Sequence, residues 1–374
     1  MNKRKITHIA RFAAPHIGGV ESVIEQINES LPDEEFEKEV FCCSNTEKSS
    51  TENGVKYKRF RYLFDFAANS VSPQLFFGMI GLKTDIIHFH MPVIQNVIIW
   101  FFLYHLGLLR YKKLLISYHG AIIGYDKYMK PFWGLYKYFY KKADKIHILS
   151  PAIIDSDEIL CKNQEKCIVI PYGINTELPE IKKNIPVNGH DIYKFANGRK
   201  ILLCMGRLVK LKGFHHAIEA VRNIDNTVLL IAGEGSEYNN FQQYINLNNL
   251  QNKILLLGNI ANKTEKDFLF KNIDIFLMPS VRTESFGIVQ LEAMNCCKPV
   301  INTNLGTGIN YVSPNEETGL TIAPDNVGEL TDAIKKLVNN ESLCRQYGQK
   351  ARERVENLFD INKIKIKYKE LYSC

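Results

Sequence analysis

Short apolar runs alternate with amphipathic helical patterns along most of the chain, and this alternation limits the possible folds more than any other feature. Such runs, separated by segments of helix length, are typical of parallel sheets whose strands are buried on both faces. In the first half, the pattern predicts strands at residues 6–12, 39–43, 85–89, 114–118, 145–149 and 167–170, and helices at 20–31 and 93–106. In the second half, it predicts strands at 200–205, 227–232, 253–257, 274–278 and 299–302, and helices at 213–222, 238–247 and 264–270. We therefore expect two parallel α/β units.

The boundary between the two units is expected near residue 172. A chain of 374 residues is too long for one ordinary core and suits two domains of about 150–200 residues. The motif Pro-Tyr-Gly-Ile-Asn at 171–175 is followed by a polar stretch with two prolines and two glycines, which predicts a hinge or linker. The pattern after Asp325 is helical to the end. We expect a first domain at 1–172, a second at 173–355 and a C-terminal helix at 356–374.

Composition disfavours several classes of protein. The apolar fraction of 45% and the charged fraction of 23% are those of a soluble globular chain. The longest apolar stretch, 97–109, includes His105 and is shorter than the roughly 18 residues of a membrane span. The N-terminus runs directly into a predicted strand, so we expect no cleavable signal peptide. The nine cysteines form no CxxC pair and no Cys/His metal spacing, so we expect them to be reduced and buried.

Loops at the predicted strand ends of the second half carry groups that suit a phosphorylated ligand. Arg207 and Lys212 lie five residues apart between a strand and a helix. The planar guanidinium group pairs with two phosphate oxygens, and the ammonium group adds a point charge, so the two suit a diphosphate. A solvated basic loop is the alternative interpretation. Gly233-Glu234-Gly235 follows another strand, and this short motif also fits an ordinary tight turn.

The stretch from Glu284 to Glu292 continues this pattern. Glu284 lies in a predicted strand-to-helix loop, and Glu292 lies inside the helix. The backbone N–H groups at the helix start have no intrahelical partner and form a site for phosphate. These groups belong to Phe286, Gly287, Ile288 and Val289. If the helix begins near Phe286, Glu292 lies roughly 9 Å along it, within reach of ribose hydroxyls. Its apolar neighbours disfavour the alternative of a surface glutamate, and strand carboxyl ends share one edge of a parallel sheet.

The first half supplies further candidates. Gly18 and Gly19 follow the first strand and let backbone approach a ligand, but the GxGxxG fingerprint is incomplete, which disfavours a nicotinamide enzyme. His119 ends another strand and could face the cleft between the halves, or could be a hydrogen-bonded structural histidine. His88 and His90 also end a strand, but metal ligands normally come as three or four convergent groups, so we reject a metal site there.

The segment 110–145 combines basic and aromatic residues. It holds nine Lys or Arg and only two Asp or Glu, interleaved with tyrosines, Phe132 and Trp133. This composition suits an anionic membrane surface, where each basic residue contributes about 1 kcal/mol. An ordinary solvated region with internal ion pairs fits equally well. A nucleic-acid partner is disfavoured because no recognisable binding motif accompanies the segment.

In their order along the chain, these motifs resemble those of the retaining glycosyltransferases of family 4 (group 1), of the type that assembles bacterial surface polysaccharides. The resemblance rests on Gly18-Gly19, His119-Gly120, Pro171-Tyr-Gly-Ile-Asn175, Gly206-Arg207, Lys212-Gly213, Gly233-Glu-Gly235, Glu284 and Glu292. It implies an α/β fold of the GT-B class, with two Rossmann-like domains facing each other across a cleft. It also implies a C-terminal helix that crosses back toward the first domain. One motif departs from the family: the loop Gly306-Thr-Gly308 lacks the acidic residue that often follows such glycines.

The resemblance also implies a role for each site residue. Arg207 and Lys212 would hold the donor diphosphate and stabilise it as it leaves, assisted by the backbone of 286–289. Glu284 would contact the donor sugar, and Glu292 the ribose. The residues expected near the base are Gly233, Glu234, Gly235, Asn259 and Ile260. Those expected toward the acceptor are Gly19, which also approaches the diphosphate, and His119 at the reaction centre.

The resemblance implies transfer of a hexose from a UDP- or GDP-sugar, with retention of configuration and without a metal ion or other cofactor. The acceptor would be a lipid-linked or oligosaccharide glycan, and the protein would be cytoplasmic and peripheral to the inner face of the membrane. Preorganised positive charge at the leaving diphosphate would be the main catalytic device. Two alternatives stay open at this point. One is a nucleotide-sugar enzyme of another class on the same fold, such as an epimerase or a phosphorylase, and the other is a non-catalytic binding module.

Overall fold

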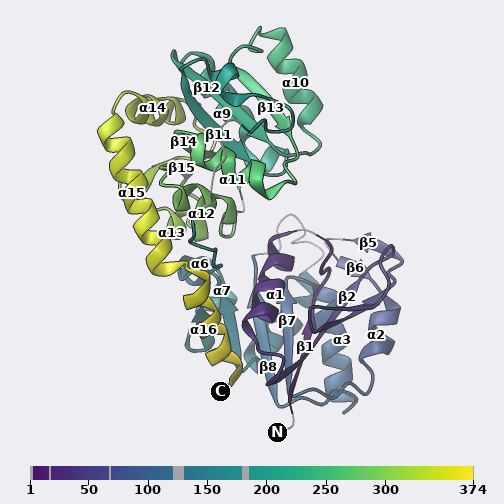
Figure 1. Cartoon of the computed structure of the whole chain (residues 1–374). Helices are drawn as coiled ribbons and strands as arrows, with labels where there is room; N and C mark the ends of the chain where they lie inside the picture. Colours follow the sequence, from purple (N-terminus) through teal and green to yellow (C-terminus); the bar gives the residue numbers. More distant parts are fainter. Residues whose placement is uncertain are drawn as a thin grey trace. The chain divides into compact units, whose positions relative to one another are not determined.

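The chain forms two compact units. A computed structural model describes residues 3–16, 18–66, 69–120, 130–178, 185–282 and 284–373 (Figure 1). The first unit comprises Met1–Gly173 together with Ile361–Cys374, and the second comprises Ile174–Asp360. The unit boundaries fall at 173/174 and 360/361, against 172/173 and 355/356 in the division made from the sequence.

The first unit is built on an eight-stranded sheet in the order β10-β9-β8-β7-β1-β2-β4-β3. All neighbouring strands are parallel except β3, which pairs antiparallel with β4. The strands are β1 (Arg4–Ile9), β2 (Phe36–Cys43), β3 (Ser50–Glu52), β4 (Val55–Phe60), β7 (Ile86–Met91), β8 (Lys113–Tyr118), β9 (Lys145–Ile148) and β10 (Cys167–Val169), with a separate pair β5 (Phe64–Phe66) and β6 (Asn69–Val71). Since β2 and β7 flank β1 on opposite sides, the strand order reverses at β1.

The helices of the first unit cover this sheet. They are α1 (Gly19–Ser30), α2 (Pro73–Met79), α3 (Ile94–His105), α5 (Trp133–Lys142), α6 (Ala152–Ser156), α7 (Glu158–Cys161) and α16 (Ile361–Ser373), with 3-10 turns at Lys130–Phe132 and Gln164–Lys166. Although α16 is the last helix of the chain, it packs against α1. The Arg4 guanidinium donates to the carbonyl oxygens of Tyr372 and Ser373, at 3.1 and 2.6 Å. The two ends of the chain therefore meet within this unit (Figure 1).

The two faces of the first sheet differ in chemistry. Ile9, Phe89 and Ile116 lie in a large apolar core, which also includes residues of α3 and α5. Successive residues of a strand point to opposite faces. The neighbours of these residues therefore form a second, polar row across four adjacent strands: His8, His88, His90, Ser117 and His147. All five side chains in this row are buried.

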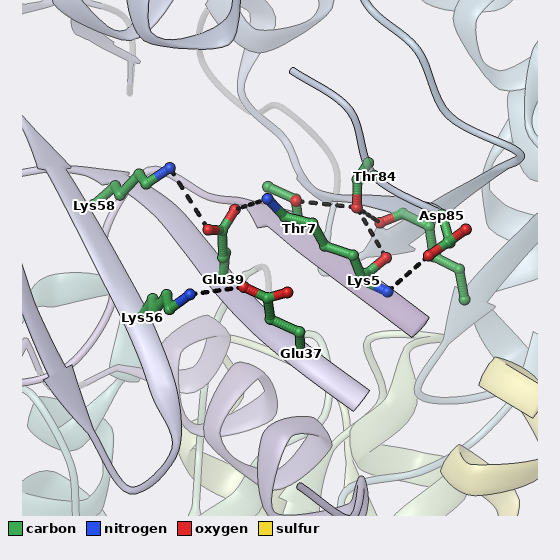
Figure 2. Close-up of polar contacts among 9 residues, drawn as sticks. Lys5, Thr7, Glu37, Glu39, Lys56, Lys58, Thr84 and Asp85 are labelled. Carbon is green, nitrogen blue, oxygen red and sulfur yellow. Dashed lines mark hydrogen bonds and ion pairs between the residues drawn. The ribbon is translucent and has the colours of Figure 1, made fainter. Parts of the chain in front are cut away.

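A network of charged residues joins the first strands of this sheet (Figure 2). The buried Glu39 carboxylate on β2 pairs with Lys5 of β1 at 3.0 Å and with Lys58 of β4 at 3.6 Å. The Lys5 backbone N–H donates to the Asp85 carboxylate at 2.8 Å. Because a buried charge is costly unless it is paired, these contacts make the register of β1, β2 and β4 specific at this position.

The second unit is built on a six-stranded sheet in the order β13-β12-β11-β14-β15-β16, and all of its strand pairs are parallel. The strands are β11 (Lys200–Met205), β12 (Thr227–Ala232), β13 (Ile254–Gly258), β14 (Ile275–Met278), β15 (Val300–Thr303) and β16 (Gly319–Ile322). The helices are α8 (Ile192–Ala196), α9 (Phe214–Arg222), α10 (Tyr238–Leu247), α11 (Lys263–Asn272), α12 (Ile288–Asn295), α13 (Gly308–Val312), α14 (Val327–Val338) and α15 (Glu341–Leu358), with a 3-10 turn at Lys210–Lys212. The strand order reverses between β11 and β14, which is where ligands bind in such sheets.

Most predicted elements are present, and the differences have physical causes. The pattern missed β4 because this strand lies beside the short edge strand β3, and its exposed lysines break the apolar run. The helical segment after 325 consists of three helices. The predicted start of the last one, 356, falls within α15, and α16 begins only at Ile361. At this break the Ile174 N–H donates to the Phe359 carbonyl at 2.8 Å, so the chain enters and leaves the second unit at neighbouring points.

The expectation for cysteines is confirmed only in part. Eight cysteines of the described residues are free, and Cys42, Cys43 and Cys204 are buried. The expectation of burial was wrong for Cys161 and Cys297, which are exposed. Among the described residues, none of the helices has both the length and the apolar character required to cross a bilayer.

Candidate functional site

Glycines let the loops after β11, β12 and β14 pack directly against one another. A Cβ atom added to Gly233 would lie 1.9 Å from the Gly206 carbonyl oxygen, and one added to Gly213 would lie 2.0 Å from that of Pro279. Gly213 and Gly233 also have positive φ angles of 65° and 135°, which side chains disfavour. The loops therefore form one continuous surface at the carboxyl edge of the second sheet, with the backbone of one loop in contact with that of the next where a side chain would otherwise stand.

The loop after β12 is held to the loop after β11 by backbone bonds. The Leu208 N–H donates to the Glu234 carbonyl at 2.8 Å, and an added Cβ at Gly235 would lie 2.3 Å from the Leu208 carbonyl. The Glu234 side chain is exposed. These contacts explain why both glycines of this motif are needed for packing, which is the tight-turn interpretation of the motif. They leave its proposed position near a base as a prediction.

Lys212 and Glu284 form an ion pair, although they come from loops 72 residues apart in the sequence. Both side chains are largely buried, with 24% and 18% of their surface exposed. The Glu284 backbone carbonyl also accepts a bond of 2.5 Å from the Thr307 hydroxyl, which ties this loop to the one after β15. Arg207 is exposed and makes no ion pair or side-chain hydrogen bond with the described residues. An anion at this edge would therefore meet an unpaired guanidinium and would compete with Glu284 for Lys212.

The helix after β14 begins later than the sequence predicted. α12 starts at Ile288, after Gly287 in a left-handed conformation with φ of 71°. Phe286 precedes the helix, and its buried ring packs against Phe359. The N–H groups of Ile288 and Val289 therefore lead the helix. Glu292 lies about 6 Å further along at 1.5 Å per residue, rather than about 9 Å.

Glu292 has a partner that the sequence did not indicate. Its carboxylate pairs with Lys266 of α11, and both side chains are about one-third exposed or less. Burial raises the pKa of Glu292, and the positive charge of Lys266 opposes this effect. Lys266 therefore fixes the carboxylate in one orientation and favours its charged form. The Lys266 side chain would have been difficult to identify, because a lysine on a polar helix carries no distinctive signal.

The loop after β13 is stabilised by a residue from far upstream. The Asn188 side-chain amide donates to the carbonyls of Leu257 and Asn259, at 2.7 and 2.8 Å. Asn259 is exposed, and Ile260 is partly buried. Gly258 accepts a bond of 2.7 Å from the Gly233 N–H, so this loop continues the same surface.

Gly19 and His119 belong to the first unit. Gly19 is the first residue of α1, and a Cβ added there would have no neighbour within 4 Å among the described residues, so its backbone faces open space. His119 directly follows β8 and is partly exposed. Its Nε2 lies 3.0 Å from the His90 Nδ1, so the structural interpretation of this histidine is correct at least for one ring nitrogen.

The exclusion of a metal site at His88 and His90 rested on the lack of a third convergent ligand, and the structure supplies one. Ring nitrogens of His8, His88 and His90 lie within 4.8 Å of one another. The sequence hid this group because His8 lies on β1, which only the strand order brings beside β7. However, hydrogen bonds already engage both ring nitrogens of His88 and both of His90. A metal ion would have to displace them.

Comparison with known proteins connects this architecture with one family. The model of the family described as Glycosyltransferase Family 4 matches residues 17–178, and that described as Glycosyl transferases group 1 matches residues 188–354. The two matches together span both units. The chain belongs to the group 1 glycosyltransferases.

Individual relatives match this group 1 glycosyltransferase over nearly its whole length. The O-antigen chain mannosyltransferase C of Escherichia coli is 26% identical, covering 99% of this chain and 98% of that protein. The D-rhamnosyltransferase WbpZ of Pseudomonas aeruginosa is 25% identical, covering 93% and 90%. Among solved structures, Anabaena HepE in complex with UDP-glucose has a TM-score of 0.76 at 17% identity and covers 99% of both chains. This glycosyltransferase therefore has the GT-B fold.

In this glycosyltransferase the segment 110–145 divides into parts of different character. Its strand β8 is buried, whereas α5 carries the exposed Trp133, Lys141 and Lys142. Lys137 pairs with Glu158 at 3.1 Å, in agreement with a solvated region, yet it also lies 6.0 Å from the centre of the exposed Trp133 ring. Residues 121–129 of the segment lie outside the described residues.

Proposed function

We propose that this glycosyltransferase is retaining and metal-independent, and that it moves a hexose from a UDP- or GDP-sugar to a lipid-linked glycan. The product would be a bacterial surface polysaccharide such as O-antigen or capsule. The observation that carries the proposal is the loop edge of the second sheet. There the Lys212–Glu284 pair, the start of α12 and Arg207, which has no ion pair within the described part of the chain, gather at the reversal of strand order. Such a collection of positive groups suits a leaving diphosphate.

The donor sugar is proposed from the relatives. Two relatives that match over more than nine-tenths of the chain are named as a mannosyltransferase and a D-rhamnosyltransferase. D-rhamnose is 6-deoxy-D-mannose, so both sugars share the configuration at C2. We therefore propose a donor of manno configuration. Glu284 would hydrogen-bond hydroxyl groups of this sugar, and Glu292, oriented by Lys266, would bind the ribose.

The ion pair of Glu284 argues against a covalent intermediate on this residue, so we propose that retention proceeds without one. A carboxylate nucleophile must be free to attack the sugar, but this carboxylate is already neutralised by Lys212. In the proposed reaction the bond from the sugar to the diphosphate breaks as the acceptor oxygen bonds to the same face. The acceptor proton passes to a leaving phosphate oxygen. Arg207 and Lys212 would stabilise the charge on the diphosphate, which is the task a metal ion performs in other transferases.

An interaction with the membrane surface is proposed for the exposed side of α3 and α5. A surface hollow of about 450 Å³ lies between these elements, and it is lined almost entirely by apolar residues. These are Ile98, Phe101, Phe102, Pro131, Phe132, Gly134, Leu135 and Tyr138. Lys141 and Lys142 are the last two residues of α5. Apolar side chains flanked by lysines suit an anionic bilayer surface, with about 1 kcal/mol for each basic residue.

Ligand-induced stabilisation tests the donor. The melting temperature is measured with GDP, UDP, GDP-mannose and UDP-glucose, each with and without EDTA. A ligand that binds the native state raises the melting temperature according to its affinity and concentration. We expect a rise with GDP-mannose that EDTA does not remove. A rise with UDP-sugars alone would reject the manno donor, and loss of the rise with EDTA would reject metal independence.

Product analysis tests the reaction. With the donor selected by the melting panel and a lipid-linked oligosaccharide, we expect transfer with an unchanged anomeric configuration, as read by NMR of the glycan. An inverted product would reject retention. Epimerisation or phosphorolysis of the donor without an acceptor would favour the other enzyme classes on this fold.

Vesicle binding tests the membrane proposal. Co-sedimentation with vesicles that contain phosphatidylglycerol should exceed that with phosphatidylcholine alone. The double variant Phe132→Ser/Trp133→Ser should reduce it, while Leu247→Ser, an exposed apolar residue of α10, should not. Equal sedimentation of all three proteins would reject this surface.

A further inference from the structure

The buried polar row of the first sheet divides into two chains of hydrogen bonds. The first chain includes His88, Ser117 and His147 and ends on Tyr372 of α16 at one side and on the Ile170 carbonyl at the other. The second chain connects His8 and His90 with His119, the residue expected at the reaction centre. Because each neutral imidazole carries one proton, the ends of each chain decide where the protons lie.

The first chain has its direction fixed by a carbonyl group. The Ile170 oxygen can only accept, so the His147 Nε2, at 2.8 Å, carries the proton. The His147 Nδ1 must then accept from the Ser117 hydroxyl at 2.7 Å. The Ser117 oxygen in turn accepts from the His88 Nε2 at 2.8 Å. The His88 Nδ1 is left to accept from the Tyr372 hydroxyl. Every proton in this chain is therefore assigned.

In the second chain, the direction of the hydrogen bonds follows from a ring nitrogen of His8. The His8 Nε2 is buried and has no hydrogen-bond partner among the described residues. A buried N–H group without an acceptor is rarer in proteins than an acceptor without a donor. The proton of His8 is therefore placed on Nδ1, where it is donated to the His90 Nε2 at 3.0 Å.

The position of the proton on His8 determines the proton positions on the other two histidines of this hydrogen-bond chain, His90 and His119. Since the His90 Nε2 accepts, its proton lies on Nδ1 and is donated to the His119 Nε2 at 3.0 Å. His119 must then carry its own proton on Nδ1. The rings of His90 and His119 are nearly parallel, with 13° between their planes, so this bond also fixes the orientation of the His119 ring.

We propose that His90 and His8 are positioning residues that hold His119 as a hydrogen-bond donor through Nδ1. The group it serves is an oxygen acceptor on the substrate, either a sugar hydroxyl or a phosphate oxygen. The substrate identity rests on the proposed function, but the proton position does not. In this state His119 is not a base toward the acceptor hydroxyl, because its Nδ1, which has no hydrogen-bond partner among the described residues, already carries a proton. The proton of the acceptor must leave by another route.

The burial of these histidines is consistent with neutral imidazole rings. Burial lowers the pKa of His8 to about 3, with a contribution from Lys38, and lowers that of His119 to about 3, with a contribution from His147. Burial also lowers the pKa of His90, with the charges of the neighbouring histidines adding to the effect. A metal ion bound by His8, His88 and His90 is the alternative. It would take one ring nitrogen from each histidine, and at His88 and His90 that nitrogen already makes an assigned hydrogen bond.

Nitrogen NMR tests the assignment directly in the unmodified protein. Long-range proton–nitrogen correlation spectra of protein labelled with ¹⁵N at histidine distinguish a proton on Nδ1 from one on Nε2. We expect Nδ1–H for His119 and for His90. His147 is an internal reference, since the Ile170 carbonyl requires Nε2–H there. An Nε2–H form of His119 would overturn the proposal, as would one equivalent of metal in the purified protein that alters these signals.

A matched pair of variants tests the positioning role. The amide of His90→Asn occupies the position of Nδ1 and keeps a partner for His119, whereas that of His90→Gln occupies the position of Nε2 and faces His8. Losing one hydrogen bond corresponds to roughly a 3- to 10-fold change. We expect His90→Gln to lower kcat by about this factor with little change in the donor KM, and His90→Asn to restore most of the loss.

The outcomes separate this proposal from the proposed function. If the unmodified protein transfers no sugar but His119 carries its proton on Nδ1, the function fails and the assignment of the proton stands. If transfer occurs but His119 carries its proton on Nε2, the function stands and the inference fails. If both variants match the unmodified protein in kcat and in the His119 signals, His90 has no positioning role.

Discussion

The two sheets of this protein have the same parallel design, with a reversal of strand order beside a central strand, but their carboxyl edges carry different chemistry. In the second unit the edge consists of glycine loops, Arg207, and two lysine–glutamate pairs. In the first unit the corresponding strands carry a row of buried histidines that ends at His119. One edge therefore offers backbone N–H groups and full charges, and the other offers neutral hydrogen-bonding groups.

This difference indicates what each unit is suited to bind. Full charges and free helix N–H groups bind an anion such as a diphosphate, and glycine allows the backbone to come close. Neutral imidazoles cost less to bury than ions and bind hydroxyl groups, which are the polar groups of a sugar. The comparison agrees with a donor diphosphate on the second unit. The four predictions below test it, in order of decreasing expected effect.

Acid should destabilise the first unit and spare the second. Burial lowers the pKa of His8 to about 3 and that of His147 to about 4, from 6.5. Below pH 6.5 the unfolded chain therefore binds more protons than the native one, and stability falls as the pH falls toward the native pKa. Each histidine contributes about 1.4 kcal/mol per pH unit, so the two lose about 4 kcal/mol in total by pH 5. No histidine of the second unit is buried in the described residues.

Urea unfolding at different pH values measures this effect. Both tryptophans, Trp100 and Trp133, lie in the first unit, so their fluorescence reports its unfolding alone. His8→Phe should reduce the pH slope by about 1.4 kcal/mol per unit, whereas the exposed His105→Phe should not. A slope that is the same in all three proteins would show that the histidine row does not control acid stability.

Removing a charge at the carboxyl edge of the second sheet should abolish most of the transferase activity. Lys212→Ala should lower kcat about 10²- to 10³-fold, the usual effect of losing a group that stabilises transition-state charge. Arg207→Ala and Glu284→Ala should also abolish most of the transfer. Lys210→Ala is the matched control, since Lys210 is exposed in the same 3-10 turn. The measurement is the initial rate of transfer, with circular dichroism to confirm folding. Near-normal rates in all the site variants would refute the assignment of the donor edge.

Filling the space at a glycine should destabilise the second unit. Gly233→Ala places a Cβ atom 1.9 Å from the Gly206 carbonyl oxygen at a φ of 135°. The backbone strain alone costs about 1–3 kcal/mol. Gly189→Ala, at a φ of 80° with no neighbour within 4 Å, should show the conformational cost without the collision. The melting temperature and the donor KM are measured for both. If Gly189→Ala is the more damaging change, the close packing of the loops is not important for this edge.

Removing the partner of Glu292 should weaken donor binding. Lys266 opposes the effect of burial on the pKa of Glu292, so Lys266→Met should raise this pKa further and leave the carboxylate without a fixed orientation. We expect the donor KM to rise about 3- to 10-fold with little change in kcat, as for the loss of one hydrogen bond. Lys263→Met on the same helix is the control, because Lys263 pairs with Asp267 and affects the pKa of Glu292 less than Lys266 does. An unchanged donor KM in Lys266→Met would contradict a role for Glu292 in donor binding.

The sequence predicted the fold class and several loop positions because the signals for these are local. In both halves of the chain the apolar runs are strands, as at 227–232, and the segments between them are helices. The glycine and cation motifs around Gly206 and Gly233 follow strands directly. Because the carboxyl ends of parallel strands share one edge of the sheet, this position was enough to group the motifs. The start of α12 was misplaced by two residues because Gly287 adopts a left-handed conformation before the helix, which the pattern of apolar residues does not reveal.

The sequence by itself determined that this chain forms two parallel α/β units and which loops lie at the carboxyl ends of their strands. The order of the strands was decided only in the tertiary structure, because hydrophobic periodicity gives each strand but not its neighbour. That order places β1 beside β7, and thus His8 beside His90. Tertiary packing also brings α11 against α12, and thus Lys266 to Glu292. A hydrogen bond or an ion pair needs two groups within about 3–4 Å, and for these pairs only the packed chain supplies that distance.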